Sequence, residues 1–272
     1  MKIIAFWGGV KIGLFNGFKK NTEIKKAYNL SKQRKYSEAL KCYEKIIDID
    51  SSYSEAWYGK GVVLSLIGDF PGALDAYDNA LDLDPNYIDA RNNKGGVLVE
   101  LGDFQGALDA YNKALDLDPN YIDAWNNKGG VLVELGDFQG ALDAYDKALD
   151  LDPNSTNILN NKGIMLAELD KKDDALECFN KILEIDPNDN DALNNKGIIL
   201  GKLGKHLEAL KYFEKASELD PNDIKTQHNK GITLKNIGKL EEALKCFNMV
   251  LKIDPNFEPA IKEKEKILSS MS

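Results

Sequence analysis

Residue types that commonly perform catalysis or bind metals are few and scattered in this 272-residue sequence. The two histidines, His206 and His228, have no recurring nucleophile, base or metal ligand beside them. The three cysteines, Cys42, Cys178 and Cys246, lie far apart and form no CxxC pair, so neither a zinc site nor a dithiol site is indicated. Unpaired cysteines are typical of a reducing compartment. We therefore predict a cytoplasmic protein that is not an enzyme and uses no metal or cofactor.

One polar motif does recur. The tetrapeptide Asn-Asn-Lys-Gly occurs at 92–95, 126–129, 160–163 and 194–197, and a variant with histidine at its first position occurs at 228–231. A side-chain amide carries both a hydrogen-bond donor and an acceptor, so it can pair with a peptide bond or with another amide. The run DLDPN also recurs, but it lacks the ligand spacing and central glycine of a calcium-binding loop.

The motif returns every 34 residues, and other residue types keep the same interval. Glycine, alanine, an aromatic residue and proline, for example Gly95, Ala107, Tyr111 and Pro119, each reappear 34 residues further on. The interval divides the chain into seven repeats, which are 20–53, 54–87, 88–121, 122–155, 156–189, 190–223 and 224–257. The third and fourth repeats differ at only three positions, which indicates a recent duplication. A fixed period of this length predicts a solenoid.

Each repeat has two helical stripes of apolar residues. The first stripe ends at a Gly-Asp turn in LGDFQG, and the second ends at DLDPN. Proline cannot continue the helix there, and aspartate or asparagine can cap the next one. Each repeat is therefore predicted to be an antiparallel helix pair that must stack on its neighbours to bury both stripes, with Gly95 and Ala107 at a close helix crossing. Residues 258–272 are predicted to form a capping helix, and the fold class is an all-α solenoid.

These residues resemble the tetratricopeptide repeat, whose pattern spaces tryptophan, leucine-glycine, tyrosine, alanine, an aromatic residue and proline over 34 residues. In the second repeat the matching residues are Trp57, Gly61, Ala73, Tyr77 and Pro85. The resemblance covers about 20–272, although lysine stands where the family has leucine before the glycine, and the first repeat is degenerate. We expect these lysines to lay their aliphatic stems over the core with the ammonium in water. The resemblance implies a right-handed superhelix whose first helices line a concave face.

The resemblance also implies a role for the repeated asparagines. In some members of the family, an asparagine at the second position of the motif holds an extended peptide by its backbone. The matching residues here are Asn93, Asn127, Asn161, Asn195 and Asn229, and the adjoining first asparagines of the candidate site are Asn92, Asn126, Asn160 and Asn194. The alternative is that these amides bond to neighbouring helices and were copied from one ancestral repeat.

The family's groove positions suggest the charge of a ligand. In the middle repeats they carry the carboxylates Asp89, Asp123, Glu100, Glu134 and Glu168, and towards the C-terminus they become the lysines Lys202, Lys225 and Lys235. An extended peptide with a basic portion is the predicted partner. The alternative is that these charges only hydrate the groove. The net charge of −9 has its acidic excess within 54–189, which argues against a nucleic-acid partner.

Residues 1–19 do not follow the repeat. They are apolar, rich in glycine and aromatic residues, and interrupted by Lys11. The segment is shorter than the roughly 20 residues that a membrane span needs, and it has no secretory cleavage pattern. It is expected either to cap the first repeat or to dock on a membrane surface or a partner.

The sequence thus predicts a non-enzymatic scaffold that binds an extended peptide of another protein in the concave groove. The alternative function is a structural assembly protein. Such a protein would self-associate through its repeats or anchor a complex to a membrane through residues 1–19, and would then be membrane-associated.

Overall fold

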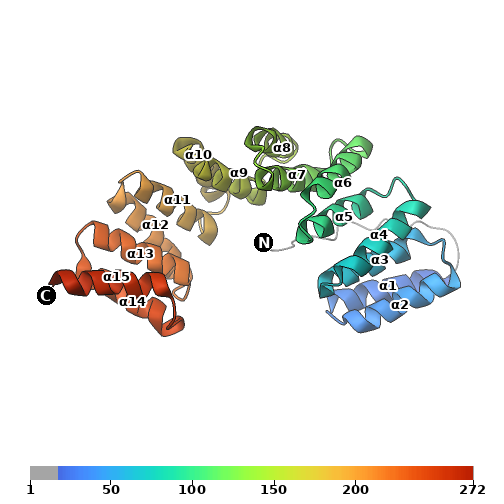
Figure 1. Cartoon of the computed structure of the whole chain (residues 1–272), viewed down its shortest axis with the longest axis horizontal. Helices are drawn as coiled ribbons and strands as arrows, with labels where there is room; N and C mark the ends of the chain where they lie inside the picture. The colour runs from blue at the N-terminus through green and yellow to red at the C-terminus, as the bar shows by residue number, and fades with distance from the viewer. Residues whose placement is uncertain (1–17, 272) are drawn as a thin grey trace. The chain divides into compact units, whose positions relative to one another are not determined.

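The computed structural model describes residues 18–271, which form fifteen α-helices and, within that range, no strand (Figure 1). The helices are α1 (Phe18–Lys32), α2 (Tyr36–Ile49), α3 (Ser54–Ile67), α4 (Phe70–Leu83), α5 (Ile88–Glu100), α6 (Phe104–Leu117), α7 (Ile122–Glu134), α8 (Phe138–Leu151), α9 (Thr156–Glu168), α10 (Lys172–Ile185), α11 (Asn190–Lys202), α12 (His206–Leu219), α13 (Ile224–Asn236), α14 (Leu240–Ile253) and α15 (Glu258–Met271). The predicted all-α class is confirmed. The expectations for residues 1–17 fall outside the described range.

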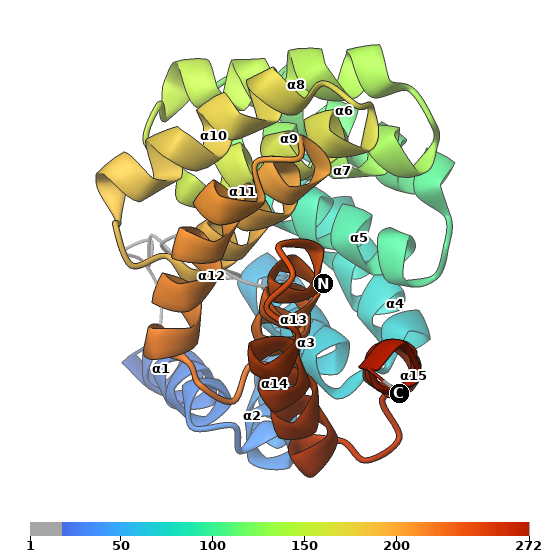
Figure 2. The same cartoon turned by 90° about the vertical axis from the view of Figure 1, so that its left-hand side faces the viewer.

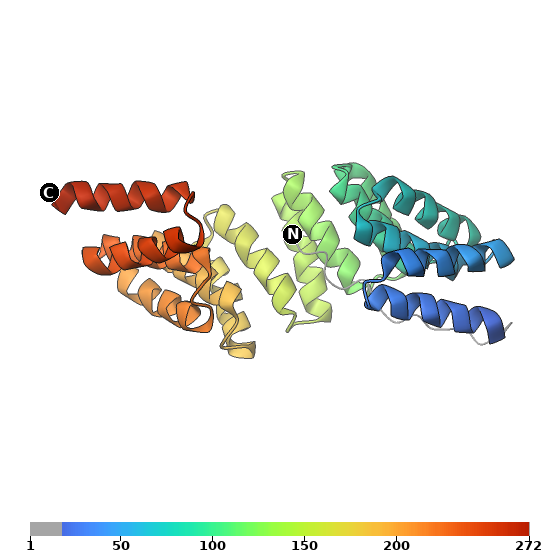
Figure 3. The same ribbon diagram turned by 90° about the horizontal axis from the view of Figure 1, so that it is seen from below.

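The helices belong to two compact units, an N-terminal unit that ends at Leu151 and a C-terminal unit that begins at Asp152. Within each unit, consecutive helices pack as pairs, such as α1 with α2 and α9 with α10 (Figures 2 and 3). The first helices of successive pairs also contact each other, α3 with α5 and α5 with α7, and likewise α9 with α11 and α11 with α13. In each unit the pairs therefore stack as they do in a solenoid.

Helix pairing depends on a glycine of the first helix that lies against an aromatic ring of the second. A Cβ atom built on Gly95 would lie 2.6 Å from the Tyr111 ring, and one built on Gly197 would lie 2.8 Å from Phe213. Ala107, on the second helix, is fully buried. This is the close crossing expected of Gly95 and Ala107.

The turn between the helices of a pair needs a left-handed residue. Gly102 has φ +78 there, and Asp103 then caps the second helix by accepting the Gly106 N–H at 2.9 Å. The equivalent residue is Arg34 in the first repeat and Asp170 in the fifth, with φ 59 and φ 60. These two side chains adopt a conformation that costs a non-glycine residue of the order of 1 kcal/mol.

The aspartate of the DPN segment ends one helix rather than capping the next. Asp84 follows α4, and its Oδ1 accepts the N–H of Asn86 at 3.0 Å. The residue before α5 is Tyr87, which makes no side-chain cap. Only α11 and α13, among the described first helices, are capped by aspartate, through Asp189 and Asp223. The expectation that this segment caps the following helix is therefore wrong for α3, α5, α7 and α9.

Two adjacent glycines of α7 allow the pairing constraint to be tested. A Cβ on Gly129 would lie 2.6 Å from the Tyr145 ring, whereas the nearest atom to a Cβ on Gly130 is 3.9 Å away. We expect Gly129→Ala to lower the free energy of unfolding by about 1–3 kcal/mol through overpacking. Gly130→Ala should leave it unchanged or raise it by up to about 1 kcal/mol, because alanine is the better helix former. Urea unfolding of both variants checks this, and equal effects would contradict it.

Candidate functional site

The second asparagine of the motif connects adjacent repeats. Its amide donates to the side chain 35 residues earlier, which occupies the first motif position of the preceding repeat. The bonds are Asn93 Nδ2 to Tyr58 Oη at 3.0 Å, Asn127 Nδ2 to Asn92 Oδ1 at 3.1 Å, and Asn195 Nδ2 to Asn160 Oδ1 at 3.0 Å. They join α3 to α5, α5 to α7 and α9 to α11. We call these three contacts the inter-repeat amide bonds.

The asparagines differ in accessibility. Asn92 and Asn93 are only 7% and 4% exposed, so they belong to the helix interface. The half-buried members of the candidate site are Asn126, Asn127, Asn160, Asn161, Asn194, Asn195 and Asn229. The Oδ1 atoms of Asn127 and Asn195 accept no hydrogen bond from residues 18–271, because only their Nδ2 groups are engaged. The side-chain oxygen of each of these two amides thus has no hydrogen-bond donor within residues 18–271.

The pattern changes in the last repeats. Asn194 donates to Asn190 O and to Thr226 Oγ1, and its own Oδ1 is buried without a partner among the described residues. His228 replaces the first asparagine, and its ring packs 5.8 Å from that of Phe247 and 5.4 Å from that of Phe257. Burial lowers the pKa of His228, whose half-buried ring contacts both phenylalanines.

The lysine that precedes the conserved glycine binds within the solenoid. Lys60 Nζ lies 3.3 Å from Glu44 Oε1 on α2, and Lys94 pairs with Asp78 on α4. Where the equivalent residue of the preceding repeat is Asn112, Lys128 lies over the Trp125 ring instead, with its Nζ 5.0 Å from the centroid. The ammonium groups of Lys60 and Lys94 therefore contact a carboxylate of the preceding second helix, and that of Lys128 contacts an aromatic face, which the expectation of an ammonium in water did not include.

A further hydrogen bond between repeats is made by different residue types at the same repeat position. The side chains of Trp57, Arg91, Trp125 and Gln227, at one repeat position, each donate to the backbone carbonyl six residues earlier. Trp125 Nε1, for example, lies 2.8 Å from Pro119 O, and Gln227 Nε2 lies 3.0 Å from Pro221 O. Any side chain that carries an N–H at this reach can make the bond, which explains how Arg91 and Trp125 alternate in otherwise almost identical repeats.

Carboxylates of the candidate site meet at the start of α5 and α7. Asp89 Oδ1 accepts the hydroxyl of Tyr121 at 2.7 Å, and burial raises the pKa of this carboxyl. Burial also raises the pKa of Asp123, and the negative charge of Asp89 raises it further. Neither carboxylate has a basic partner among residues 18–271. Their charge is thus not neutralised by a described residue of this chain.

The other charges of the candidate site lie apart from this pair. Glu100 and Glu134 are exposed at the opposite ends of α5 and α7, roughly 16 Å along each helix, and Glu168 is exposed at the end of α9. Lys202 and Lys225 are exposed, whereas Lys235 pairs with Glu263 of α15. The structure therefore brings together Asp89 and Asp123 but separates them from the three glutamates.

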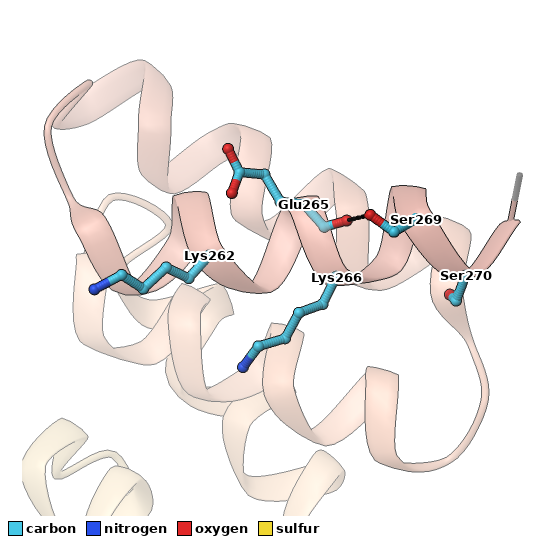
Figure 4. Close-up of a pocket in the computed structure, with 5 residues that line it drawn as sticks. All are labelled: Lys262, Glu265, Lys266, Ser269 and Ser270. Carbon is cyan, nitrogen blue, oxygen red and sulfur yellow. Dashed lines mark hydrogen bonds between the residues drawn. The ribbon is translucent and has the colours of Figure 1, made fainter.

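A surface hollow lies on the outer side of α15 (Figure 4). It is lined by Lys262, Glu265, Lys266, Ser269 and Ser270, all of them exposed. Ser269 Oγ donates to the backbone carbonyl of Glu265 at 2.8 Å, so this hydroxyl takes part in the helix itself. The hollow brings together no nucleophile and base, and we assign it no chemistry.

Residues 18–271 contain no group of three or more histidine, cysteine, aspartate or glutamate side chains arranged to hold a metal ion. None of the helices in the same range is long and apolar enough to span a membrane.

The inter-repeat amide bonds can be measured in a double-mutant cycle on Asn92 and Asn127. Either alanine substitution removes the bond of 3.1 Å, so the coupling free energy should be about 0.5–1.5 kcal/mol. Asn112→Ala is the control, because Asn112 makes no hydrogen bond within the described chain and alanine favours the helix. Chemical denaturation of the four cycle proteins gives the coupling. A coupling near zero would show that the bond contributes nothing to stacking.

Docking of α15 should depend on pH through Glu263. The hydrogen bond from Lys235, followed by that from Lys266, lowers the pKa of Glu263 below its usual 4.5. A depressed carboxyl pKa contributes stability that is present above the usual value and is lost as pH falls through the folded-state pKa. We expect the protection of α15 amides against exchange, relative to an unstructured chain at the same pH, to fall below about pH 4.5, and Glu263→Gln to weaken docking at neutral pH by about 1 kcal/mol. Glu265→Gln, on the same helix, should have no such effect; an equal effect would contradict the assignment.

The sequence was compared with protein families, curated proteins and solved structures. Two family models, each described as tetratricopeptide repeat, match the chain, one at 24–88, 67–122 and 92–156 and the other at 156–189, 191–223 and 224–257. The comparison with curated proteins gave no match.

Similar solved structures share the fold. A tetratricopeptide repeat protein from Parabacteroides merdae is 19% identical with a TM-score of 0.69, covering 93% of this chain and 100% of that one. PilF of Pseudomonas aeruginosa is 20% identical with a TM-score of 0.68, covering 80% and 98%. YrrB, described as having an unusual peptide-binding site, is 26% identical with a TM-score of 0.57, covering 71% and 99%. The family matches span most of the sequence, and the chain therefore belongs to the tetratricopeptide repeat family, whose members are generally non-enzymatic scaffolds for protein–protein interaction.

Proposed function

We propose that this protein is an interaction scaffold whose N-terminal unit binds an extended, basic peptide segment along α5 and α7. The observation that carries the proposal is the pair Asp89 and Asp123. Desolvation raises the pKa of both carboxyls, and the charge of Asp89 also raises that of Asp123, although Asp123 is exposed and only Asp89 is half-buried. Neither has a basic partner in the described chain. A lysine or arginine of a ligand, placed between them, would supply the missing positive charge, and its ion pair with the half-buried Asp89 would be stronger than one at an open surface.

The repeated asparagines have a divided role in this proposal. Asn92 and Asn93 hold the repeats together, since they are buried and bonded. Asn127 uses its Nδ2 for the inter-repeat amide bond and offers its Oδ1 to a backbone N–H of the ligand. In the C-terminal unit Asn195 has the same arrangement. Contacts of this kind read the ligand backbone, so they tolerate many ligand sequences.

Two further observations support a peptide ligand. Solenoid repeats present extended surfaces formed by successive first helices, which suit an extended chain. YrrB, which shares 26% identity, is described as a tetratricopeptide repeat protein with an unusual peptide-binding site. Neither observation identifies the ligand, and the basic character of the proposed ligand rests on the two aspartates alone.

The proposal is tested with two pools of synthetic dodecapeptides, one with fixed lysines and one with fixed glutamates. We expect the full-length protein to prefer the lysine pool, and Asp89→Asn with Asp123→Asn to weaken that binding by about tenfold or more. The same double variant should be at least as stable as the parent, because burial disfavours both charged forms. Fluorescence anisotropy and thermal unfolding measure the two quantities.

The matched control is Asp109→Asn with Asp143→Asn, which makes the same change in net charge on the exposed faces of α6 and α8. This control should leave binding almost unchanged. Equal weakening by both double variants would show that only net charge matters. A parent protein without preference for the lysine pool would reject the proposal.

A further inference from the structure

Every second helix of the N-terminal unit ends in a half-exposed or exposed aliphatic side chain. The exposed fractions are 61% for Ile49, 42% for Leu83, 40% for Leu117 and 38% for Leu151. Each of these residues follows an exposed aspartate, as Ile49 follows Asp48. We define the Leu-Asp edge as Ile49, Leu83 and Leu117 together with Asp48, Asp82 and Asp116. The end of each of α2, α4 and α6 thus carries one exposed carboxylate followed by one apolar side chain.

The carboxylates of the Leu-Asp edge have no partner in the described chain. Asp48, Asp82 and Asp116 are exposed and form no ion pair or hydrogen bond with residues 18–271. The aspartates that follow the aliphatic residues differ, since Asp84 and Asp118 accept backbone N–H groups of their own turns at 3.0 Å and 2.9 Å. The edge therefore combines apolar surface with negative charge that is available to a basic, apolar partner.

The chain enters the solenoid at this edge. Early α1 lies beside late α2, since Lys45 Nζ is 3.3 Å from Glu23 Oε1, and Ile24 and Ile46 share one core cluster. The first described residue, Phe18, therefore lies at the same end of the α1–α2 pair as Ile49. At 61%, Ile49 is also the most exposed residue at its repeat position, where the other six range from 38% at Leu151 to 45% at Leu219.

Residues 1–17, MKIIAFWGGVKIGLFNG, have the complementary chemistry. They contain Lys2 and Lys11, no acidic residue, and otherwise mainly aliphatic, aromatic and glycine residues. Such a segment can place apolar side chains on Ile49 and Leu83 while its ammonium groups meet the aspartates. Seventeen residues reach up to about 56 Å when extended. The second helices do not contact one another, since α3 separates α2 from α4 and α5 separates α4 from α6. Two helix spacings of roughly 8–10 Å each then place the end of α4 within about 20 Å of the end of α2, and the end of α6 within about 40 Å of it, so all three ends lie within reach.

We propose that residues 1–17 bind in cis to the Leu-Asp edge of the N-terminal unit. The segment then covers the apolar side chains at the ends of α2 and α4 and neutralises Asp48 and Asp82. This surface is formed by the ends of second helices, whereas the proposed peptide site lies on first helices. The two proposals are therefore independent, and a ligand of α5 and α7 does not compete for this edge.

Hydrogen exchange of residues 1–17 in the full-length protein tests the proposal. We expect these amides to exchange at least about tenfold more slowly than in an unstructured chain, and to lose this protection in Asp82→Lys with Asp116→Lys. The matched control is Glu184→Lys with Glu218→Lys, which makes the same change at the same repeat position in the C-terminal unit. The control should keep the protection. A variant with Leu83→Ser should lose part of it.

Each other outcome would overturn the proposal. Unprotected amides in the parent would mean that the segment is not bound, and protection that appears only with vesicles of phosphatidylcholine and phosphatidylglycerol would make a membrane its binding partner. Protection that rises with protein concentration would assign the edge to a second copy of the chain. Protection that survives the charge reversal at Asp82 and Asp116 would place the segment elsewhere. Circular dichroism of every variant confirms that the solenoid remains folded.

Discussion

The contact between a glycine on the first helix and an aromatic ring on the second sets the distance between the helices of each complete repeat. A Cβ at Gly61 or Gly231 would lie 2.7 Å from the ring of Tyr77 or Phe247, so the two backbones approach more closely than any other residue would allow. The degenerate first repeat shows how the constraint can move. Ala27 replaces the glycine there, and a Cβ on Gly59 of the next repeat would instead lie 2.4 Å from Tyr43. Gly59 occupies the position that is asparagine in later repeats, which explains why the inter-repeat amide bonds begin only with Asn93.

With the pairs fixed in this way, polar groups decide how one pair stacks on the next. The inter-repeat amide bonds, the ion pairs of Lys60 and Lys94, and the donors to the carbonyl six residues earlier all join neighbouring repeats. Buried polar groups are costly unless they are bonded, so these contacts favour one stacking register over others. The side chains that we propose for ligand binding, such as Asp89 and Asn127, are ones that these contacts leave incompletely satisfied. The stacking interface and the proposed binding surface thus use the same helices.

The sequence was sufficient to predict the helix pairs, their stacking and the small residues between them, because a strict interval and helical apolar spacing have one compact solution. Tertiary partners were less accessible to prediction. The amide of Asn127 was predicted either for a ligand or for a neighbouring helix, and only the distance to Asn92 shows that its donor is engaged. Lys94 forms an ion pair because residue 78 of the preceding repeat is an aspartate, whereas Lys128 contacts a tryptophan because the equivalent residue 112 is an asparagine. The spacing of apolar residues does not predict such pairs of polar residues from different repeats. The hydrogen bonds that Trp57, Arg91 and Gln227 donate to the carbonyl six residues earlier were not predicted, because the three residue types differ. The pattern that could have predicted them is a side chain with an N–H group at the same position of several repeats.

The inter-repeat amide bonds give the third repeat an acceptor on one side and a donor on the other. Asn92 accepts from the repeat that follows, while Asn93 donates to the repeat that precedes it. A copy of such a repeat inserted in register would complete the bonds of both neighbours and leave no polar group orphaned. The number of such repeats can therefore change without any change in the residues at the interfaces between them. The near identity of residues 88–121 and 122–155 is what growth by such an insertion would leave behind.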